Sequence, residues 1–76
     1  MNQVGLITGG GGGIGGAVAH RMAAAGISVI IADDDGAAAE RVKSEIVKAG
    51  GLADALAIDV TVAGEVKAVV MDVEKR

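Results

Sequence analysis

The 76-residue sequence contains no cysteine, no proline and no aromatic residue. Without cysteine there is no disulfide framework and no thiolate metal site, and nothing indicates an oxidising compartment. The absence of tyrosine removes a group of catalytic roles that depend on a phenolic proton donor. Proline at average usage, about 5%, would appear roughly four times. We therefore expect a cytoplasmic protein whose composition is unusually simple.

Positive charge is also scarce. Seven Lys and Arg oppose ten Asp and Glu, for a formal net charge of −3. This balance argues against nucleic acid as a partner, because such binding depends on clustered basic groups. The longest uncharged stretch, residues 1–19, is interrupted by glycines, so we expect no membrane span and no membrane partner. At 51% apolar residues the chain is not disordered, and residues 1–76 read as a single domain.

The apolar residues are mostly small. The chain has 15 Ala, 11 Val and 7 Ile but only three Leu. Small side chains each bury little apolar area, and a short chain has a small core. We therefore expect either a marginally stable monomer or a homo-oligomer that buries more surface.

The hydrophobic pattern predicts β-α-β-α-β-α with short connections. Strands are expected at 4–8, 27–32 and 55–58, and helices at about 14–25 and 36–49. A last helix over about 61–73 would present Val62, Val66, Val69, Val70 and Val73 on one stripe. Because valine is a mediocre helix former, a strand over 66–71 remains an alternative.

The second helix has the clearest pattern. Ala39, Val42, Ile46 and Ala49 form one apolar stripe, and charged residues occupy the other face. Arg41 is expected to pair with Glu45, which can also pair with Lys48. Before this helix, residues 33–35 are three aspartates that read as a turn and N-cap rather than as a metal site. Met22 and Met71 are predicted in the core, and His20 facing solvent.

Right-handed crossovers predict parallel strands in the order 3-2-1, with the first two helices on one face. This is an α/β fold, half of a doubly wound sheet of Rossmann type. The outer edge of the first strand and one sheet face would be left uncovered. Such bare surfaces again favour a homo-oligomer.

Seven of the eight residues at positions 9–16 are glycine, and only Ile14 interrupts them. Glycines between a strand and a helix allow the backbone to approach a phosphate, and the helix N-terminus favours the anion. G-x-G-x-x-G matches in two registers, 10-12-15 and 11-13-16, so the expression alone is weak evidence. A flexible glycine linker is the alternative. A P-loop is excluded, because the first lysine is Lys43.

Residues 8–15, TGGGGGIG, resemble the T-G-x-x-x-G-I-G turn of the short-chain dehydrogenase/reductase family. Asp33 at the end of the second strand, and Asp59-Val60 at the end of the third, also match that family in order and spacing. The resemblance covers the whole chain and its cofactor-binding half. It implies that three glycines shape the turn over the dinucleotide: Gly9, Gly13 and Gly15.

The resemblance also assigns roles to four other residues. Ile14 would lie beside the pyrophosphate and nicotinamide ribose, and Asp33 would accept hydrogen bonds from the adenosine ribose. Asp59 would meet the adenine amino group, and Val60 would line the adenine pocket. A carboxylate at Asp33 repels a 2′-phosphate, so NAD is expected, weakly bound, and NADP is disfavoured.

The catalytic Tyr-x-x-x-Lys pair and Ser of that family have no counterpart here, since the sequence has no tyrosine. We therefore expect no catalytic residue, and a dinucleotide-binding fragment that is not a dehydrogenase by itself. Its partners would be a dinucleotide or adenine nucleotide and either a second copy or the missing C-terminal half. The alternative is a minimal or designed Rossmann-like scaffold that self-associates without useful ligand binding.

Overall fold

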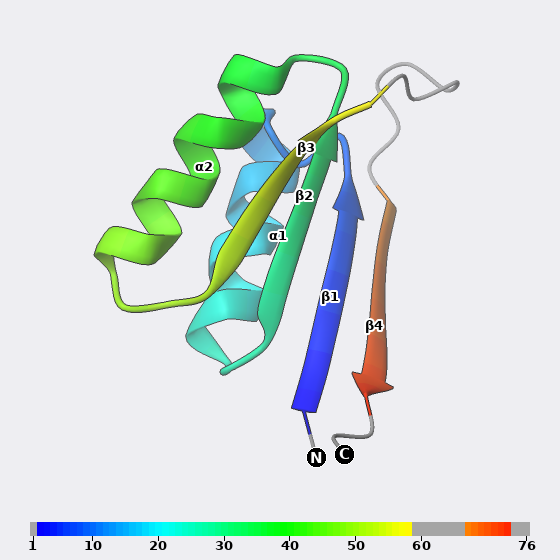
Figure 1. Ribbon diagram of the computed structural model, residues 1–76, viewed down its shortest axis with the longest axis vertical. Coiled ribbons are helices and arrows are strands. Elements are labelled where there is room, and N and C mark those ends of the chain that lie inside the picture. The colour runs from blue at the N-terminus through cyan, green and yellow to red at the C-terminus, as the bar shows by residue number, and fades with distance from the viewer. Residues whose placement is uncertain (1, 59–66, 74–76) are drawn as a thin grey trace.

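The computed structural model describes residues 2–58 and 67–73. In these residues the elements follow one another as β1 (Asn2–Thr8), α1 (Gly13–Ala24), β2 (Ser28–Asp33), α2 (Gly36–Lys48), β3 (Ala53–Ala57) and β4 (Lys67–Val73). The strands form one sheet with the spatial order β3-β2-β1-β4 (Figure 1).

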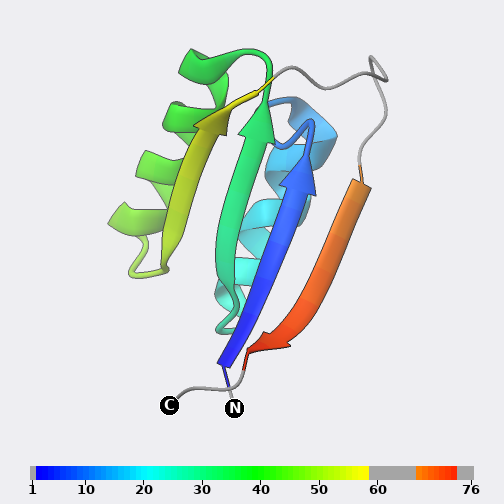
Figure 2. The ribbon, with the colours of Figure 1, turned by 45° about the vertical axis from the view of Figure 1, so that its right-hand side comes forward.

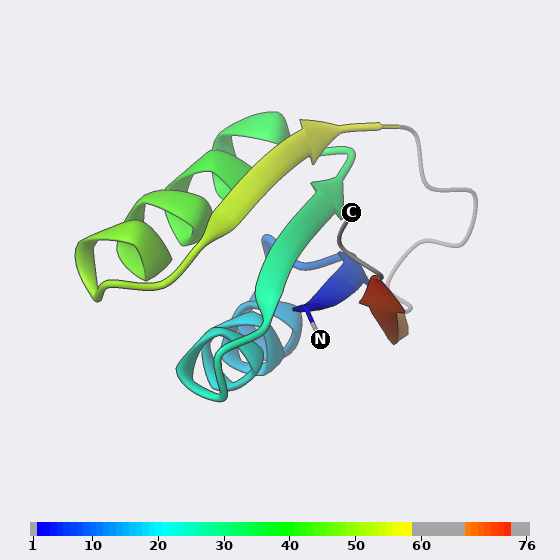
Figure 3. The same cartoon turned by 60° about the horizontal axis from the view of Figure 1, so that its bottom comes forward.

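The first three strands are parallel and confirm the predicted order 3-2-1. Ile7 of β1 is level with Ile31 of β2, which in turn is level with Ala55 of β3. The connections between these strands run through α1 and α2, which lie on the same face of the sheet (Figures 2 and 3). All three parallel strands therefore bring their carboxyl ends to one edge.

The core lies between this sheet face and the two helices. Ile7, Val29 and Ile31 of the strands pack with Ala19 and Met22 of α1, as predicted for Met22. From α2 the cluster includes the first three residues of the predicted stripe: Ala39, Val42 and Ile46. The fourth, Ala49, is exposed at the end of the helix. Small side chains thus allow both helices to pack on the sheet.

The predicted last helix is wrong over residues 67–73, which form β4 antiparallel to β1. The alternative strand was the better prediction. Consecutive β-branched residues such as Val69 and Val70 favour a pleated strand, and the free edge of β1 supplies backbone partners for it. The expected helical positions Val62 and Val66 lie outside the described residues.

β4 changes which surfaces are uncovered. It pairs with β1 from Thr8 to Asn2, so the outer edge of β1 is covered by the same chain and not bare as expected. Gln3 Nε2 on β1 also donates to Asp72 Oδ1 on β4 at 3.1 Å. Met71, predicted in the core, is 49% exposed.

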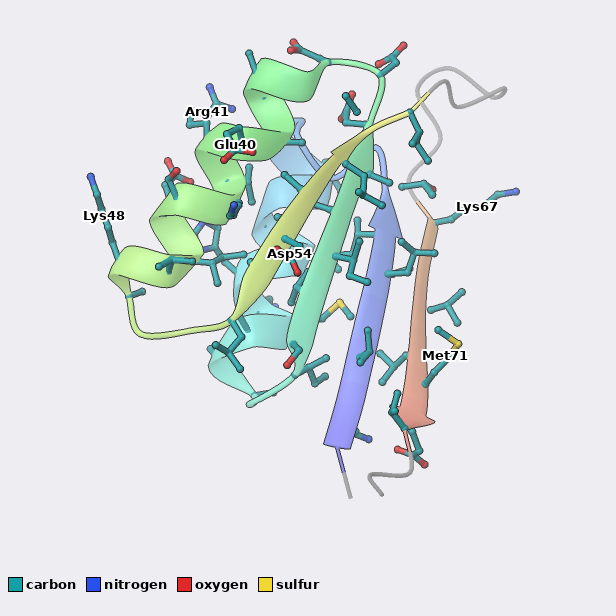
Figure 4. The ribbon with its side chains drawn as sticks, viewed as in Figure 1. Glu40, Arg41, Lys48, Asp54, Lys67 and Met71 are labelled. Carbon is teal, nitrogen blue, oxygen red and sulfur yellow. The ribbon has the colours of Figure 1, made fainter. Side chains whose placement is uncertain are left out.

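The sheet face opposite the helices keeps exposed apolar side chains. Ile7 of β1 points toward the helices, so its neighbour Leu6 points away from them. Val69 is level with Leu6, and Met71, labelled in Figure 4, is level with Val4, so all four side chains lie on the face opposite the helices. Leu56 of β3 is also exposed. None of the described helices covers this face (Figure 2). None of them is long and apolar enough to cross a membrane.

Candidate functional site

The glycine-rich turn connects β1 to α1 at the carboxyl edge of the sheet. Gly9 has φ +72°, a left-handed conformation that favours glycine, and its N–H donates to the Ala32 carbonyl of β2 at 2.8 Å. Gly15, in the first turn of α1, passes close to this backbone: a Cβ there would stand 2.8 Å from Gly10 Cα. The turn is therefore a folded segment packed against its helix, and not a flexible linker.

The N-terminus of α1 has no side-chain cap. Gly12 is the N-cap and has no side chain to accept from the helix, and no acidic residue stands in the first turn. The first N–H groups of an α-helix have no partner within the helix, and the helix dipole makes this end positive. Ile14 is 76% exposed beside these donors. The arrangement suits an anion with an apolar group next to it.

Asp33, the last residue of β2, points at the same turn. Its Oδ2 accepts from Gly11 N at 2.9 Å, and its Oδ1 accepts from Asp35 N at 2.9 Å. The side chain is buried, with the residue only 9% exposed. The Asp35 N–H lowers the pKa of the Asp33 carboxyl below its ordinary value of 3.8; burial opposes this, and the Gly11 N–H adds to the lowering. Asp33 is thus an ionised group at the edge of the turn.

These residues fit the adenosine-diphosphate part of a dinucleotide. A Cβ built at Gly13 meets nothing within 4 Å, so open space adjoins the uncapped helix N-terminus. Each oxygen of the Asp33 carboxylate has two lone pairs and accepts from one backbone amide, Gly11 N at Oδ2 and Asp35 N at Oδ1. A diphosphate would lie against the N–H groups of α1, and a sugar hydroxyl would donate to Asp33.

The structure brings together five of the predicted site residues: Gly9, Gly13, Ile14, Gly15 and Asp33. Asp59 and Val60, predicted at the adenine, lie outside the described residues. The predicted N-cap is confirmed at Asp35, which caps α2 by accepting from Ala38 N at 3.1 Å, whereas Asp33 is the last residue of β2. In the described residues no three metal-binding side chains gather.

Sequence reasoning missed two contributors, Gly11 and Arg41. Arg41 Nη2 donates to the Gly11 carbonyl at 3.3 Å, whereas the sequence predicted a pair with Glu45. Glu45 Oε1 instead lies 3.0 Å from His20 Nε2 of α1, so His20 is not simply solvated. The topology contained a signal: α2 begins at the same sheet edge as the turn, so a long basic side chain near its start can reach the turn.

Two hollows lie at the opposite edge of the sheet. One, of about 180 Å³, is lined by residues such as Ile27 and Leu52; the other, of about 310 Å³, lies between α1 and α2 beside His20 and Ile46. Both are lined mainly by small or apolar residues and include no part of the glycine turn. The backbone amides and the carboxylate that suit a nucleotide therefore lie at the glycine turn and not in either hollow.

Comparison with known proteins identifies the family to which the chain is similar. The sequence profile described as short chain dehydrogenase matches residues 3–76. A search of curated proteins found no match. Among solved structures, a metagenomic short-chain oxidoreductase in complex with NADP is 38% identical, with a TM-score of 0.72, over 75% of this chain and 26% of that one.

Two further structures are similar. A 3-ketoacyl-ACP reductase from Sinorhizobium meliloti is 48% identical over 74% of this chain and 22% of that one, with a TM-score of 0.72. A hydroxysteroid dehydrogenase from Escherichia coli is 46% identical over 66% of this chain and 21% of that one, with a TM-score of 0.64. This chain therefore spans about a quarter of the length of the structures that it matches.

Proposed function

Since the chain belongs to the short-chain dehydrogenase/reductase family, we propose that residues 9–15 and Asp33 bind the adenosine-diphosphate part of an NAD-type dinucleotide. The observation that carries this proposal is the 2.9 Å hydrogen bond from Gly11 N to Asp33 Oδ2. This hydrogen bond places the Asp33 carboxylate, which can accept from sugar hydroxyls, beside the glycine turn. The same turn leads into the N-terminus of α1, which suits a diphosphate. Asp59 and Val60 complete the adenine end of the proposed site.

NAD is the preferred dinucleotide in this proposal. The Asp33 carboxylate stays ionised above its lowered pKa, and a 2′-phosphate beside it would be repelled. Affinity is weak in this proposal, because a turn made of glycines offers a diphosphate backbone groups only and no side-chain contacts. One of the similar structures is a complex with NADP, which supports a dinucleotide as the cofactor.

These 76 residues do not transfer hydride by themselves in this proposal. The family contains NAD(P)-dependent oxidoreductases, but the sequence has no tyrosine for the proton-donating role that the family gives to that residue. In this proposal the chain supplies cofactor binding, and none of its residues takes the role of that tyrosine.

A partner is the second part of the proposal. The exposed apolar side chains opposite the helices, among them Leu56, Val69 and Met71, support association with a second copy or with a C-terminal half. This surface also supports the alternative of a self-associating scaffold without ligand binding. Sedimentation velocity at micromolar concentration is expected to show a species larger than the monomer, and a folded monomer alone would contradict self-association.

Calorimetric titration distinguishes the binding protein from the scaffold. We expect NAD and ADP-ribose to bind with similar Kd values, on the order of 0.1–1 mM, or about −4 to −5.5 kcal/mol. Nicotinamide mononucleotide, which lacks the adenosine, serves as the control and is expected to give no measurable heat. No heat and no change of melting temperature with millimolar NAD or ADP-ribose would leave only the scaffold.

A further inference from the structure

Gly11 is bonded at both its amide and its carbonyl by charged side chains from different elements. Its N–H donates to Asp33 Oδ2 of β2 at 2.9 Å, and its carbonyl accepts from Arg41 Nη2 of α2 at 3.3 Å. Hydrogen bonds with an ionised partner are stronger than neutral ones. The middle residue of a side-chain-free turn is therefore fixed in orientation by an anion on one side and a cation on the other.

The start of α2 also packs directly on Gly11. A Cβ at Gly11 would stand 2.8 Å from Ala38 Cβ and 2.9 Å from Ala39 N, which leaves no room for a side chain. Ala39 is completely buried in the core, and Val42, next to Arg41 in sequence, is almost completely buried. The helix that carries Arg41 is thus anchored to the core, and the Arg41 backbone cannot drift from the turn.

From these contacts we propose that Arg41 is a positioning residue for the nucleotide site. Its guanidinium holds the Gly11 carbonyl, and this keeps the Gly11 N–H on Asp33 and the turn in its binding conformation before a ligand arrives. The turn has no side chains of its own to restrict it, so the restriction comes from α2. The effect on ligand affinity rests on the proposed function, whereas the effect on the turn does not.

Arg41→Gln tests this role by hydrogen exchange of the Gly11 amide and by the Kd for ADP-ribose. We expect Gly11 exchange to accelerate about tenfold and the Kd to rise about fivefold, while core amides such as Ile31 change little. Arg41→Lys, which keeps a charged donor, is expected to recover part of both effects. Lys48→Gln removes the same charge from the far end of α2 and is expected to change neither (Figure 4).

Three outcomes would overturn the positioning role. Unchanged Gly11 exchange with weaker ADP-ribose binding would make Arg41 a direct ligand contact. Faster exchange throughout the core would make it a general stabilising residue, and no change in either measurement would leave it without a role. If the unaltered protein binds no ADP-ribose, the proposed function fails, and Gly11 exchange still decides whether Arg41 fixes the turn.

Discussion

Replacing Gly15 with alanine is expected to lower the free energy of unfolding by about 3 kcal/mol, the upper end for overpacking a tight site. The added Cβ would collide with the Gly9 carbonyl oxygen and stand 2.8 Å from Gly10 Cα. These are backbone atoms, which can move only if the whole turn shifts away from α1. Denaturant unfolding followed by circular dichroism gives the stability difference directly.

The control for this substitution is Gly13→Ala in the same helical turn. A Cβ at Gly13 meets nothing within 4 Å, and alanine favours the helix over glycine by about 1 kcal/mol. We expect this variant to be as stable as the parent protein or more so. Equal stability of the Gly15→Ala variant and its control would show that the turn does not pack on α1 as described.

Replacing Asp33 with asparagine is expected to cost about 2–3 kcal/mol at pH 7. The N–H groups of Gly11 and Asp35 donate to different oxygens of the Asp33 carboxylate. Asparagine replaces one of these oxygens with an NH2 group, so one of the two N–H groups would face a donor and lose its hydrogen bond. We also expect NAD to bind at least tenfold more weakly and the discrimination against NADP to shrink. Chemical unfolding gives the stability, and calorimetry with both dinucleotides gives the preference.

Acidic pH is expected to remove much of the difference in stability between the parent protein and the Asp33→Asn variant. Because folding lowers the pKa of Asp33, its ionised form stabilises the protein above the ordinary pKa of 3.8, and that stability is lost as the pH falls through the folded-state pKa. The stability gap between the parent protein and Asp33→Asn is therefore widest near neutral pH and narrows at lower pH. A gap that stays constant from pH 7 to acid would show that the carboxylate charge is not the cause.

The parallel half of the fold could be predicted because several local signals agree. The apolar stripe of α2, the capping Asp35 and the glycines after β1 all indicate the same β-α-β-α-β order. For residues 67–73 the signals disagree. The valine spacing suits a helix, the β-branched side chains suit a strand, and the open edge of β1 decided for the strand. The predicted topology left that edge uncovered, but the periodicity of residues 67–73 does not indicate that they pair with it.

The positions of Gly9, Gly15 and Asp33 at one turn could be predicted from residue identity and spacing, and their role toward a nucleotide stays a prediction. The contact of Arg41 with Gly11 could not be predicted, because charge spacing within α2 equally suits a pair with Glu45. The structure decides between these two partners of Arg41. His20 of α1 lies beside Glu45, and the glycine turn lies beside Arg41. Which group a charged side chain of α2 contacts depends on how closely α1 and the glycine turn pack against α2, and the sequence does not give these distances.

Whether this turn holds a nucleotide is best decided by the NAD affinity of Gly13→Ala, measured beside that of the parent protein with both fully folded. At this position a methyl group has room in the fold. In the proposed site it would stand beside the helix N-terminus, where the diphosphate is expected to approach the backbone. Binding at least tenfold weaker, with undiminished stability, is the expected result. An unchanged Kd would mean that the nucleotide, if it binds, does so away from the glycines.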